Sequence, residues 1–361
     1  MALQRVNWRD PRLRYIIAAV LASVLLAGLW LAVDRINHPN LMPGGAPWRR
    51  FQVIGFYQNA PASGYGQTSL ASYRAHWRQI TTVSPLWLSI AANGSLSNNG
   101  YDASLVDLAH RRHRLVVPLV TNAGGASTVL LQSSTRRLAA QNVAAAVKQY
   151  HLDGINLDFE LLKPSSRMDL NRFVADLAAR LKPLHKVLAV SVFPLAGLST
   201  SVNGAYDYAA LAASANYLVI MAYDHHYNGS PPGPVAPYGW VQTNVDQALK
   251  VVPSRKLVLA IGMYGYDWIA THTTMSAATV SDAAAEILAK AHGVKPRYVA
   301  DISQNTFKYT ANGVPHVVWY MGDRSAKARV ALAESGHLAG VALWQLGDEN
   351  ARFWSVMPRR P

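Results

Sequence analysis

The stretch DGINLDFE, residues 153–160, decides how the rest of the chain is interpreted. Polar and apolar residues alternate in it, and residues two apart on a β-strand point to the same side. Asn156, Asp158 and Glu160 therefore share one face of the predicted strand. Buried carboxylates on one face raise each other's pKa, which keeps one of them protonated at neutral pH, as a general acid requires. The alternative is a solvated edge strand on which two acids meet by chance.

Short apolar runs that repeat along the chain predict a closed barrel. Between most of them lie segments with the apolar spacing of helices, such as 139–150, 167–184 and 241–251. Strands and helices that alternate in this way form a parallel sheet covered by helices, and eight units suit a (β/α)8 TIM barrel. The predicted strands are 51–57, 86–91, 115–121, 154–160, 187–193, 217–224, 257–263 and 340–346.

The alternation is interrupted once, between the seventh and eighth predicted strands. A small α+β insertion is predicted there, over about residues 269–339. Its segment 280–292 has helical spacing. The segments 298–309 and 314–320 flank Asn312-Gly313, a dipeptide typical of a two-residue hairpin turn, so they are predicted to pair.

The amino-terminal segment predicts a membrane anchor. Residues 15–33 are uncharged and about long enough to cross a bilayer as a helix. The arginines of residues 1–14 make that stretch a cytoplasmic basic tail and place the following domain on the periplasmic or extracellular side. Residues 34–50 have the Pro and Gly content of a linker to a barrel domain over 51–361. The sequence thus predicts a single-pass protein of the inner (cytoplasmic) membrane; a cleaved signal peptide is disfavoured by a poor cleavage site.

Composition narrows the function classes. The 361 residues are 50% hydrophobic and include no cysteine, which excludes disulfides and zinc–thiolate sites. The formal net charge of +14 favours a polyanionic partner, but no nucleic-acid-binding motif accompanies it and nucleic acid is not expected. His225 and His226 are adjacent and diverge in direction, without a carboxylate at ligand spacing, so no metal is expected.

Polar residues collect where the predicted strands end, which is where barrels of this type carry their active sites. The third strand runs into Asn122, and the fourth ends in Asp158 and Glu160. The sixth ends in MAYD, residues 221–224, and the eighth carries Trp344, which by itself is more typical of a core and is assigned to the site only by its place at a strand end. Three alternating aromatic residues after the seventh strand suit either a sugar groove or the seat of the insertion, and both remain open: Tyr264, Tyr266 and Trp268.

These motifs resemble glycoside hydrolase family 18. The fourth-strand signature of that family is Asp-Gly-x-Asp-x-Asp-x-Glu, and residues 153–160 match it except for Asn156 in place of the second Asp. The chain looks most like the spore-cortex-lytic branch and the modules fused to polysaccharide deacetylases and glycosyltransferases, in which Asn at this position is usual. The other matching stretches are GFY 55–57, PLVTN 118–122, MAYD 221–224, SPPGPVA 230–236, GMYGYDW 262–268 and WQLG 344–347.

The resemblance implies substrate-assisted, retaining hydrolysis of β-1,4 linkages at N-acetylglucosamine, with no metal or organic cofactor. By this analogy Glu160 protonates the leaving oxygen and then activates water, Asp158 orients the acetamido group, and Tyr223 hydrogen-bonds the acetamido oxygen. The implied substrate-binding residues are Asn122, Asn156, Met221, Asp224 near the cleavage point and Trp344 under the sugar ring.

Several alternatives remain open at this level. The same barrel suits a catalytically silent glycan-binding protein or a component of an exopolysaccharide assembly. The polymer is undecided between peptidoglycan, a chitin-like oligomer and poly-N-acetylglucosamine, as are endo or exo action and the oligomeric state. Because Asn156 cannot ionise, we expect coupling between Asp158 and Glu160 to dominate the pH profile, so that Asp158→Asn changes its acidic limb.

Overall fold

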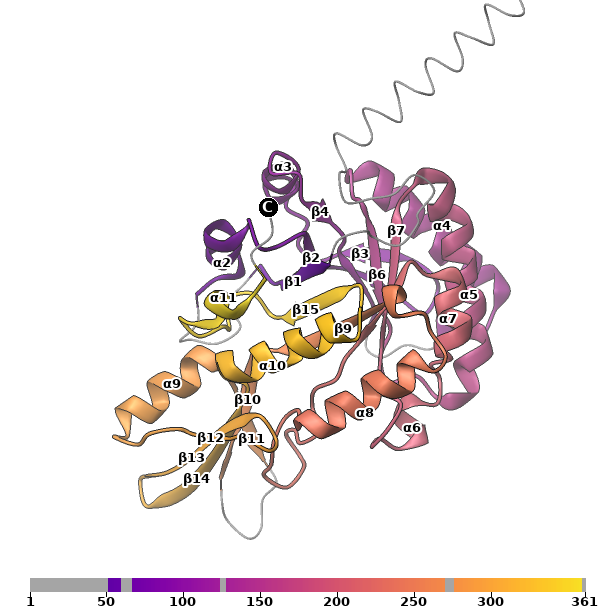
Figure 1. Ribbon diagram of the computed structural model, residues 1–361. Coiled ribbons are helices and arrows are strands. Elements are labelled where there is room, and N and C mark those ends of the chain that lie inside the picture. The colour runs from indigo at the N-terminus through magenta and orange to yellow at the C-terminus, as the bar shows by residue number, and fades with distance from the viewer. Residues whose placement is uncertain (1–50, 60–66, 124–127, 270–275, 359–361) are drawn as a thin grey trace, which may run out of the picture.

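The computed structural model describes residues 51–59, 67–123, 128–269 and 276–358, and a parallel barrel forms its centre (Figure 1). Within these residues β1 pairs with both β15 and β2, which closes the sheet and confirms the predicted (β/α)8 barrel. Its strands are β1 (Gln52–Tyr57), β2 (Thr82–Ile90), β5 (Leu119–Asn122), β6 (Gly154–Asp158), β7 (Val187–Val192), β8 (Tyr217–Ile220), β9 (Leu257–Gly262) and β15 (Gly340–Trp344); the short β3 (Leu96–Asn98) and β4 (Leu115–Val116) pair with β2.

Alternation along the strands creates two apolar layers. One cluster fills the barrel and includes Ile54, Leu119 and Val258. The other lies between the strands and the helices, and it contains Ile155 and Leu157 from β6. The polar residues of β6 therefore point inward, as the alternation in residues 153–160 predicts.

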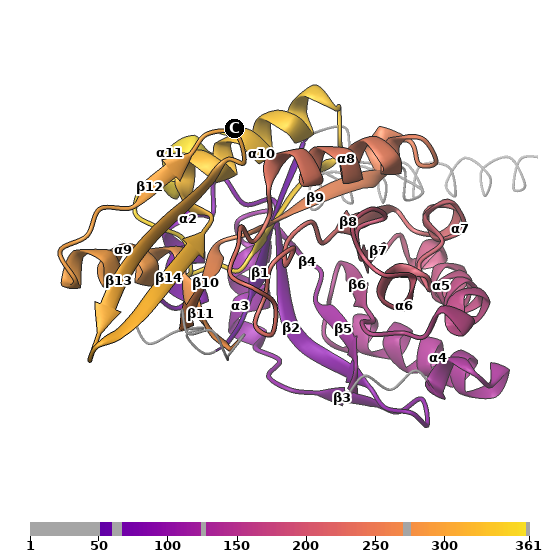
Figure 2. The ribbon, with the colours of Figure 1, turned by 90° about the horizontal axis from the view of Figure 1, so that it is seen from below.

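Helices surround the barrel on its outer face (Figure 2). Their starts are fixed by side-chain caps where the sequence offers them: Thr68 accepts from Ala71 N, and Asp102 accepts from Ser104 N and Leu105 N. The helices are α2 (Ser69–His76), α3 (Ala103–His110), α4 (Ser133–Gln149), α5 (Arg167–Leu181), α6 (Thr200–Asn203), α7 (Tyr208–Ser214), α8 (Tyr238–Leu249), α10 (Gly322–Ser335) and α11 (Phe353–Val356).

A second, antiparallel sheet lies between β9 and α10 in the chain and beside the barrel in space (Figure 1). Ala311 pairs with Val314, so Asn312 and Gly313 form the predicted hairpin turn, both at positive φ. The described strands, in spatial order, are β11 (Ala277–Ser281), β10 (Tyr264–Ile269), β14 (Val314–Tyr320), β13 (Gln304–Ala311) and β12 (Arg297–Val299), and α9 (Asp282–Ala291) packs on one face.

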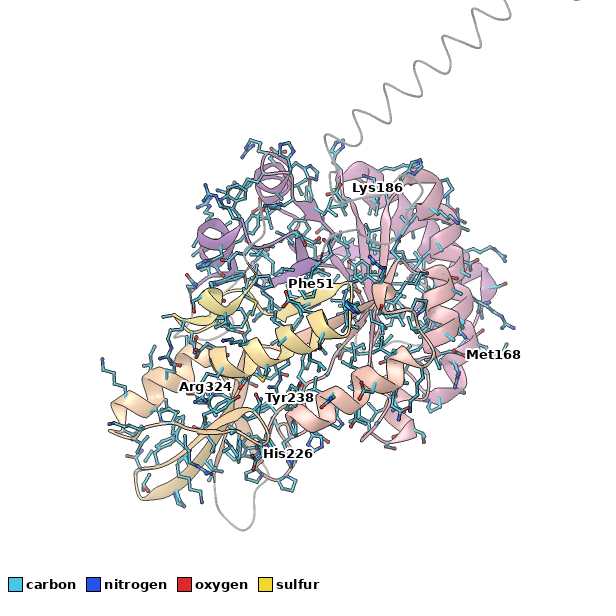
Figure 3. All side chains as sticks on the ribbon, viewed as in Figure 1. Phe51, Met168, Lys186, His226, Tyr238 and Arg324 are labelled. Carbon is cyan, nitrogen blue, oxygen red and sulfur yellow. The ribbon has the colours of Figure 1, made fainter. Side chains whose placement is uncertain are left out.

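Two contacts tie this sheet to the barrel helices. The guanidinium of Arg324, on α10, stacks over the ring of Tyr298 at 3.8 Å, and Tyr238 N, on α8, donates to Ile302 O at 2.9 Å. Figure 3 labels Arg324 and Tyr238 on the side of the molecule that carries the second sheet. The sheet is therefore held against the barrel near the loops that follow β8 and β9.

The predicted single-pass membrane location is not supported by the residues that the structure describes. Among the residues that it describes, no helix is both long and apolar enough to cross a membrane. The longest described helix, α4, has 17 residues and carries Arg136, Arg137 and Lys148, whereas a spanning helix needs about 20 mostly apolar residues. The predicted tail, anchor and linker, residues 1–14, 15–33 and 34–50, lie outside the described residues.

Candidate active site

The carboxyl end of β6 brings two acids to the mouth of the barrel. Asp158 is the last residue of the strand and is 7% exposed, while Glu160 follows it and is half-buried. Ser191 Oγ, on the neighbouring β7, lies within hydrogen-bond reach of both the Asp158 carboxyl and Asn156 Oδ1, the latter at 3.3 Å, and its single hydroxyl proton serves one of these acceptors at a time. The inward face of β6 is therefore polar, ordered and almost closed to water.

The first two residues of the same motif, Asp153 and Gly154, stabilise the barrel and lie away from this mouth. A Cβ at Gly154 would lie 2.1 Å from Val187 O on β7, so only glycine allows the two strands to pair here. Asp153 is buried at the opposite end of the strand, where its carboxylate accepts from Val116 N at 2.8 Å and contacts His110 Nε2 at 2.8 Å. One short motif thus carries a structural acid and a candidate catalytic pair at its two ends.

The two acids at the mouth have raised pKa values. Burial raises the pKa of Asp158 to about 6, against the hydrogen bond from Ser191, which lowers it. Burial and, to a smaller extent, the negative charges of Asp158 and Asp224 together raise the pKa of Glu160 to about 7. Near neutral pH, Glu160 can therefore both give a proton and accept one. Burial contributes more to this shift than the coupling between the acids on which the sequence argument relied.

Tyr223 and Asp224 extend the site from the loop after β8. Burial raises the pKa of Tyr223 well above its usual value, and the charges of Asp158, Glu160 and Asp224 add to the effect, so its hydroxyl remains a donor. Asp224 has a φ of 58°, a left-handed conformation that Asp adopts more readily than most residues. Its Oδ1 accepts hydrogen bonds from the hydroxyl of Tyr264 at 2.5 Å and from the hydroxyl of Tyr266 at 2.9 Å; both tyrosines are on β10.

The aromatic residues of β10 were left open by the sequence between lining a sugar groove and seating the insertion. Tyr264 and Tyr266 belong to the second sheet, where they pair with Ser281 and Thr279 of β11, and both also line the pocket at the barrel mouth. The third aromatic residue of the series, Trp268, is fully buried and donates from Nε1 to Ser230 O at 3.1 Å. Two of the three residues thus reach the pocket, and the third packs beneath it.

Trp344 ends β15 and forms another wall of this pocket, whose volume is about 360 Å³. Its ring packs edge-on against Phe56 with the centroids 5.2 Å apart, and it remains partly exposed. The pocket is within the size range of sites for small ligands. It is lined by Gln58, Asp224, Tyr264, Tyr266, Thr279, Ser281, Trp344, Gln345 and Asp348.

The other sequence-predicted residues occupy different surroundings. Asn156 and Met221 are almost fully buried, at 2% and 6% exposure. The Asn122 side chain is hydrogen-bonded to the backbone of Glu160. His225 and His226 have ring centroids 5.0 Å apart, and no group of three or more His, Asp or Glu side chains in the described parts of the chain is arranged to hold a metal ion.

Sequence reasoning missed Ser191, Gln345 and Asp348. Ser191 is the one polar residue in the apolar strand 187–193, at a position two residues after Ala189, and that interruption was a usable signal. Gln345 lies inside the predicted eighth strand, 340–346, and Asp348 follows it; the WQLG stretch 344–347 resembles the family, but the resemblance assigns no role to either residue. Their position in the pocket results from the packing of β15 against the second sheet.

Comparison with known proteins identifies the family. Residues 52–349 match the family described as glycosyl hydrolases family 18. The chain belongs to glycosyl hydrolase family 18. This family 18 hydrolase is 30% identical over 275 residues to YdhD of Bacillus subtilis, named as a sporulation-specific glycosylase, which covers 74% of the chain and 66% of the relative. A cortical fragment-lytic enzyme of Bacillus anthracis is 26% identical, with 73% and 64% covered. The chain thus spans about two thirds of the length of these curated relatives.

Solved structures of family 18 hydrolases and their relatives match the same region. A chitinase from Chromobacterium violaceum superposes with a TM-score of 0.77 at 28% identity, covering 85% of this chain and 98% of the chitinase. The spore cortex-lytic enzyme SleL of Bacillus cereus has a TM-score of 0.77 at 24% identity, covering 85% and 73%, and supports the fold. The family resemblance inferred from the motifs is confirmed, and the protein is a glycoside hydrolase.

Proposed function

We propose that this hydrolase cleaves β-1,4 linkages at N-acetylglucosamine residues of an envelope or extracellular polysaccharide by substrate-assisted, retaining catalysis. The observation that carries the proposal is Glu160, a half-buried carboxyl group with a pKa of about 7 beside Asp158 at the barrel mouth. Such a group is suited to act as general acid and general base in one cycle. Relatives named as a chitinase and as a cortical fragment-lytic enzyme support a glycan substrate.

In the proposed first step, Glu160 donates its proton to the glycosidic oxygen while the N-acetyl oxygen of the bound sugar attacks the anomeric carbon. The bond between that carbon and the glycosidic oxygen breaks, the leaving sugar departs with the proton, and an oxazolinium-like ion remains. Asp158 accepts a hydrogen bond from the acetamido nitrogen and balances the positive charge. Water then attacks the anomeric carbon from the side that the leaving group left and gives its proton to Glu160, which retains the configuration.

The remaining site residues have supporting roles in this proposal. Tyr223 donates a hydrogen bond to the acetamido oxygen, for which its protonated hydroxyl is suited. Asp224, held by Tyr264 and Tyr266, binds a sugar hydroxyl near the cleavage point. Trp344 lies under the ring, since an exposed aromatic face suits the apolar face of a sugar.

Glu160→Gln tests the proposal directly. The substitution keeps the shape of the side chain and removes the transferable proton, so turnover of a chromogenic N-acetylglucosamine oligomer should fall by roughly 10²–10⁴-fold. Glu334→Gln, on the exposed last turn of α10, is the matched control and should retain full activity. Unchanged turnover in Glu160→Gln would refute the assignment. Mass spectrometry of the products from peptidoglycan, chitin oligomers and poly-N-acetylglucosamine then identifies the polymer.

A further inference from the structure

Part of the pocket beside Trp344 has no role in the reaction proposed above. Gln345 and Asp348 belong to the segment that follows β15, and Thr279 and Ser281 face them from β11. The two walls are joined where Ala283 N donates to Asp348 O at 3.2 Å. This polar surface therefore has a fixed position relative to Trp344.

Gln345 carries an unsatisfied acceptor in this surface. The residue is 4% exposed, and its Oε1 has no hydrogen-bond partner among the residues that the structure describes. Its amide group hydrogen-bonds to the carboxyl of Asp348, which orients Oε1 away from that neighbour. Buried polar atoms in folded proteins are almost always paired, so an acceptor without a protein partner in a pocket wall is one that a ligand hydroxyl or a water can satisfy.

The same wall concentrates acidic side chains. Asp224 and Asp348 both line the pocket, and none of its described lining residues is Lys, Arg or His. Burial, with a smaller contribution from the charge of Glu349, raises the pKa of Asp348 to about 7, so Asp348 is ionised mainly above neutral pH. The fully buried Asp282 lies behind the wall, and the charge of Asp348 helps to raise its pKa. The pocket is thus acidic although the whole chain has a formal charge of +14.

We propose that Gln345 and Asp348 form a specificity subsite that binds hydroxyl groups of a neutral amino-sugar ring and excludes rings that carry a carboxylate. Gln345 Oε1 accepts a hydrogen bond from one sugar hydroxyl, and the carboxyl of Asp348 accepts from another. Where Asp224 and Asp348 are ionised, a carboxylate such as the 3-O-lactyl group of a muramic acid residue meets two negative charges and no cation there, and like charges in a partly desolvated pocket repel strongly. The inference rests on the proposed function in that it places a substrate sugar beside Trp344.

Binding by the full chain carrying Glu160→Gln tests this subsite without turnover. The probes are the N-acetylglucosamine tetramer and a peptide-free tetrasaccharide in which N-acetylglucosamine alternates with N-acetylmuramic acid, each measured by calorimetry about one pH unit above the pKa of Asp348, where most of this group is ionised. The neutral tetramer should bind at least about tenfold more tightly, as expected for like charges a few ångströms apart. Adding Asp348→Asn, which keeps the shape and removes one charge, should reduce that preference by about threefold or more, whereas Asp246→Asn on the exposed face of α8 should leave it unchanged.

Equal affinity for the two tetrasaccharides, or a preference that Asp348→Asn leaves intact, would overturn the subsite. Circular dichroism of each variant establishes that it is folded before its affinity is compared. The two proposals fail separately. Selective binding of the neutral tetramer without any product from the unsubstituted enzyme would refute the hydrolytic function and support the subsite. Hydrolysis of both tetrasaccharides, bound with equal affinity, would support the hydrolytic function and refute the subsite.

Discussion

Asn122 holds the backbone of Glu160 through two reciprocal hydrogen bonds. Asn122 Nδ2 donates to Glu160 O at 2.9 Å, and Glu160 N donates to Asn122 Oδ1 at 3.0 Å. Asn122 ends β5 and Glu160 lies just beyond β6, so the clamp joins the mouths of two neighbouring strands. Since a general acid must be held within hydrogen-bond reach of the atom it protonates, this clamp determines where the carboxyl group stands.

Removing the clamp should slow chemistry more than it weakens binding. We expect Asn122→Ala to lower kcat by about 10–100-fold with KM within about threefold, because the substrate still binds while Glu160 is displaced. Steady-state kinetics on an N-acetylglucosamine oligomer measures both constants. A raised KM with kcat unchanged would show instead that Asn122 contacts the sugar, as the sequence resemblance implied.

The pH profile should have an alkaline limb near neutrality. Glu160 must be protonated to act as an acid, so kcat/KM should fall as pH rises through its pKa of about 7. The charge of Asp158 contributes to that raised pKa. In Asp158→Asn the pKa of Glu160 should therefore be lower, and the alkaline limb of the residual activity should shift to a lower pH. The sequence-based prediction that the acidic limb also changes is tested in the same titration. An alkaline limb at the same pH in both proteins would contradict the assignment.

Tyr266→Phe should impair substrate handling through Asp224. The substitution deletes one of two phenolic donors to Asp224 Oδ1 and leaves the aromatic ring in place. A hydrogen bond to a charged group contributes about 1.5–3 kcal/mol, which corresponds to a loss of roughly 10–100-fold in kcat/KM. Because these bonds lower the pKa of Asp224, their removal should also raise it. Tyr227→Phe, in the exposed part of the following loop, is the control and should behave as the unsubstituted enzyme.

Asp348→Asn should stabilise the protein at neutral and alkaline pH. The folded state holds the pKa of Asp348 at about 7, above its usual value of 3.8, so the folded state binds the proton more tightly than the unfolded state. Stability from this group is complete below pH about 4 and is lost as pH rises towards 7. The introduced asparagine cannot ionise, so the variant does not lose stability as the pH rises. Its free energy of unfolding should exceed that of the unsubstituted protein by about 2–4 kcal/mol above pH 7 and by almost nothing at pH 4. Urea unfolding at both pH values measures the difference, and an equal change at both would contradict the assignment.

Features that depend on a single segment were predictable from the sequence. The alternation in residues 153–160 correctly placed Asn156 and Asp158 on the inner face of β6, because the direction of a side chain on a strand follows from the pleat alone. The succession of apolar runs correctly predicted the barrel, and Asn312-Gly313 correctly predicted a hairpin turn. Strand ends were less predictable: β8 ends at Ile220, four residues before the predicted limit at 224.

The relationships between segments were decided only by the tertiary structure. The sequence indicated that Asn122, Asp224 and Trp344 lie near one mouth, but not that Asn122 bonds the backbone of Glu160 or that Tyr264 and Tyr266 bond Asp224. It also could not separate the structural acid Asp153 from the candidate catalytic acids of the same motif. The physical reason is that periodicity sets which way a side chain points, whereas burial, charge and hydrogen-bond partners depend on elements far away in the chain that packing brings together.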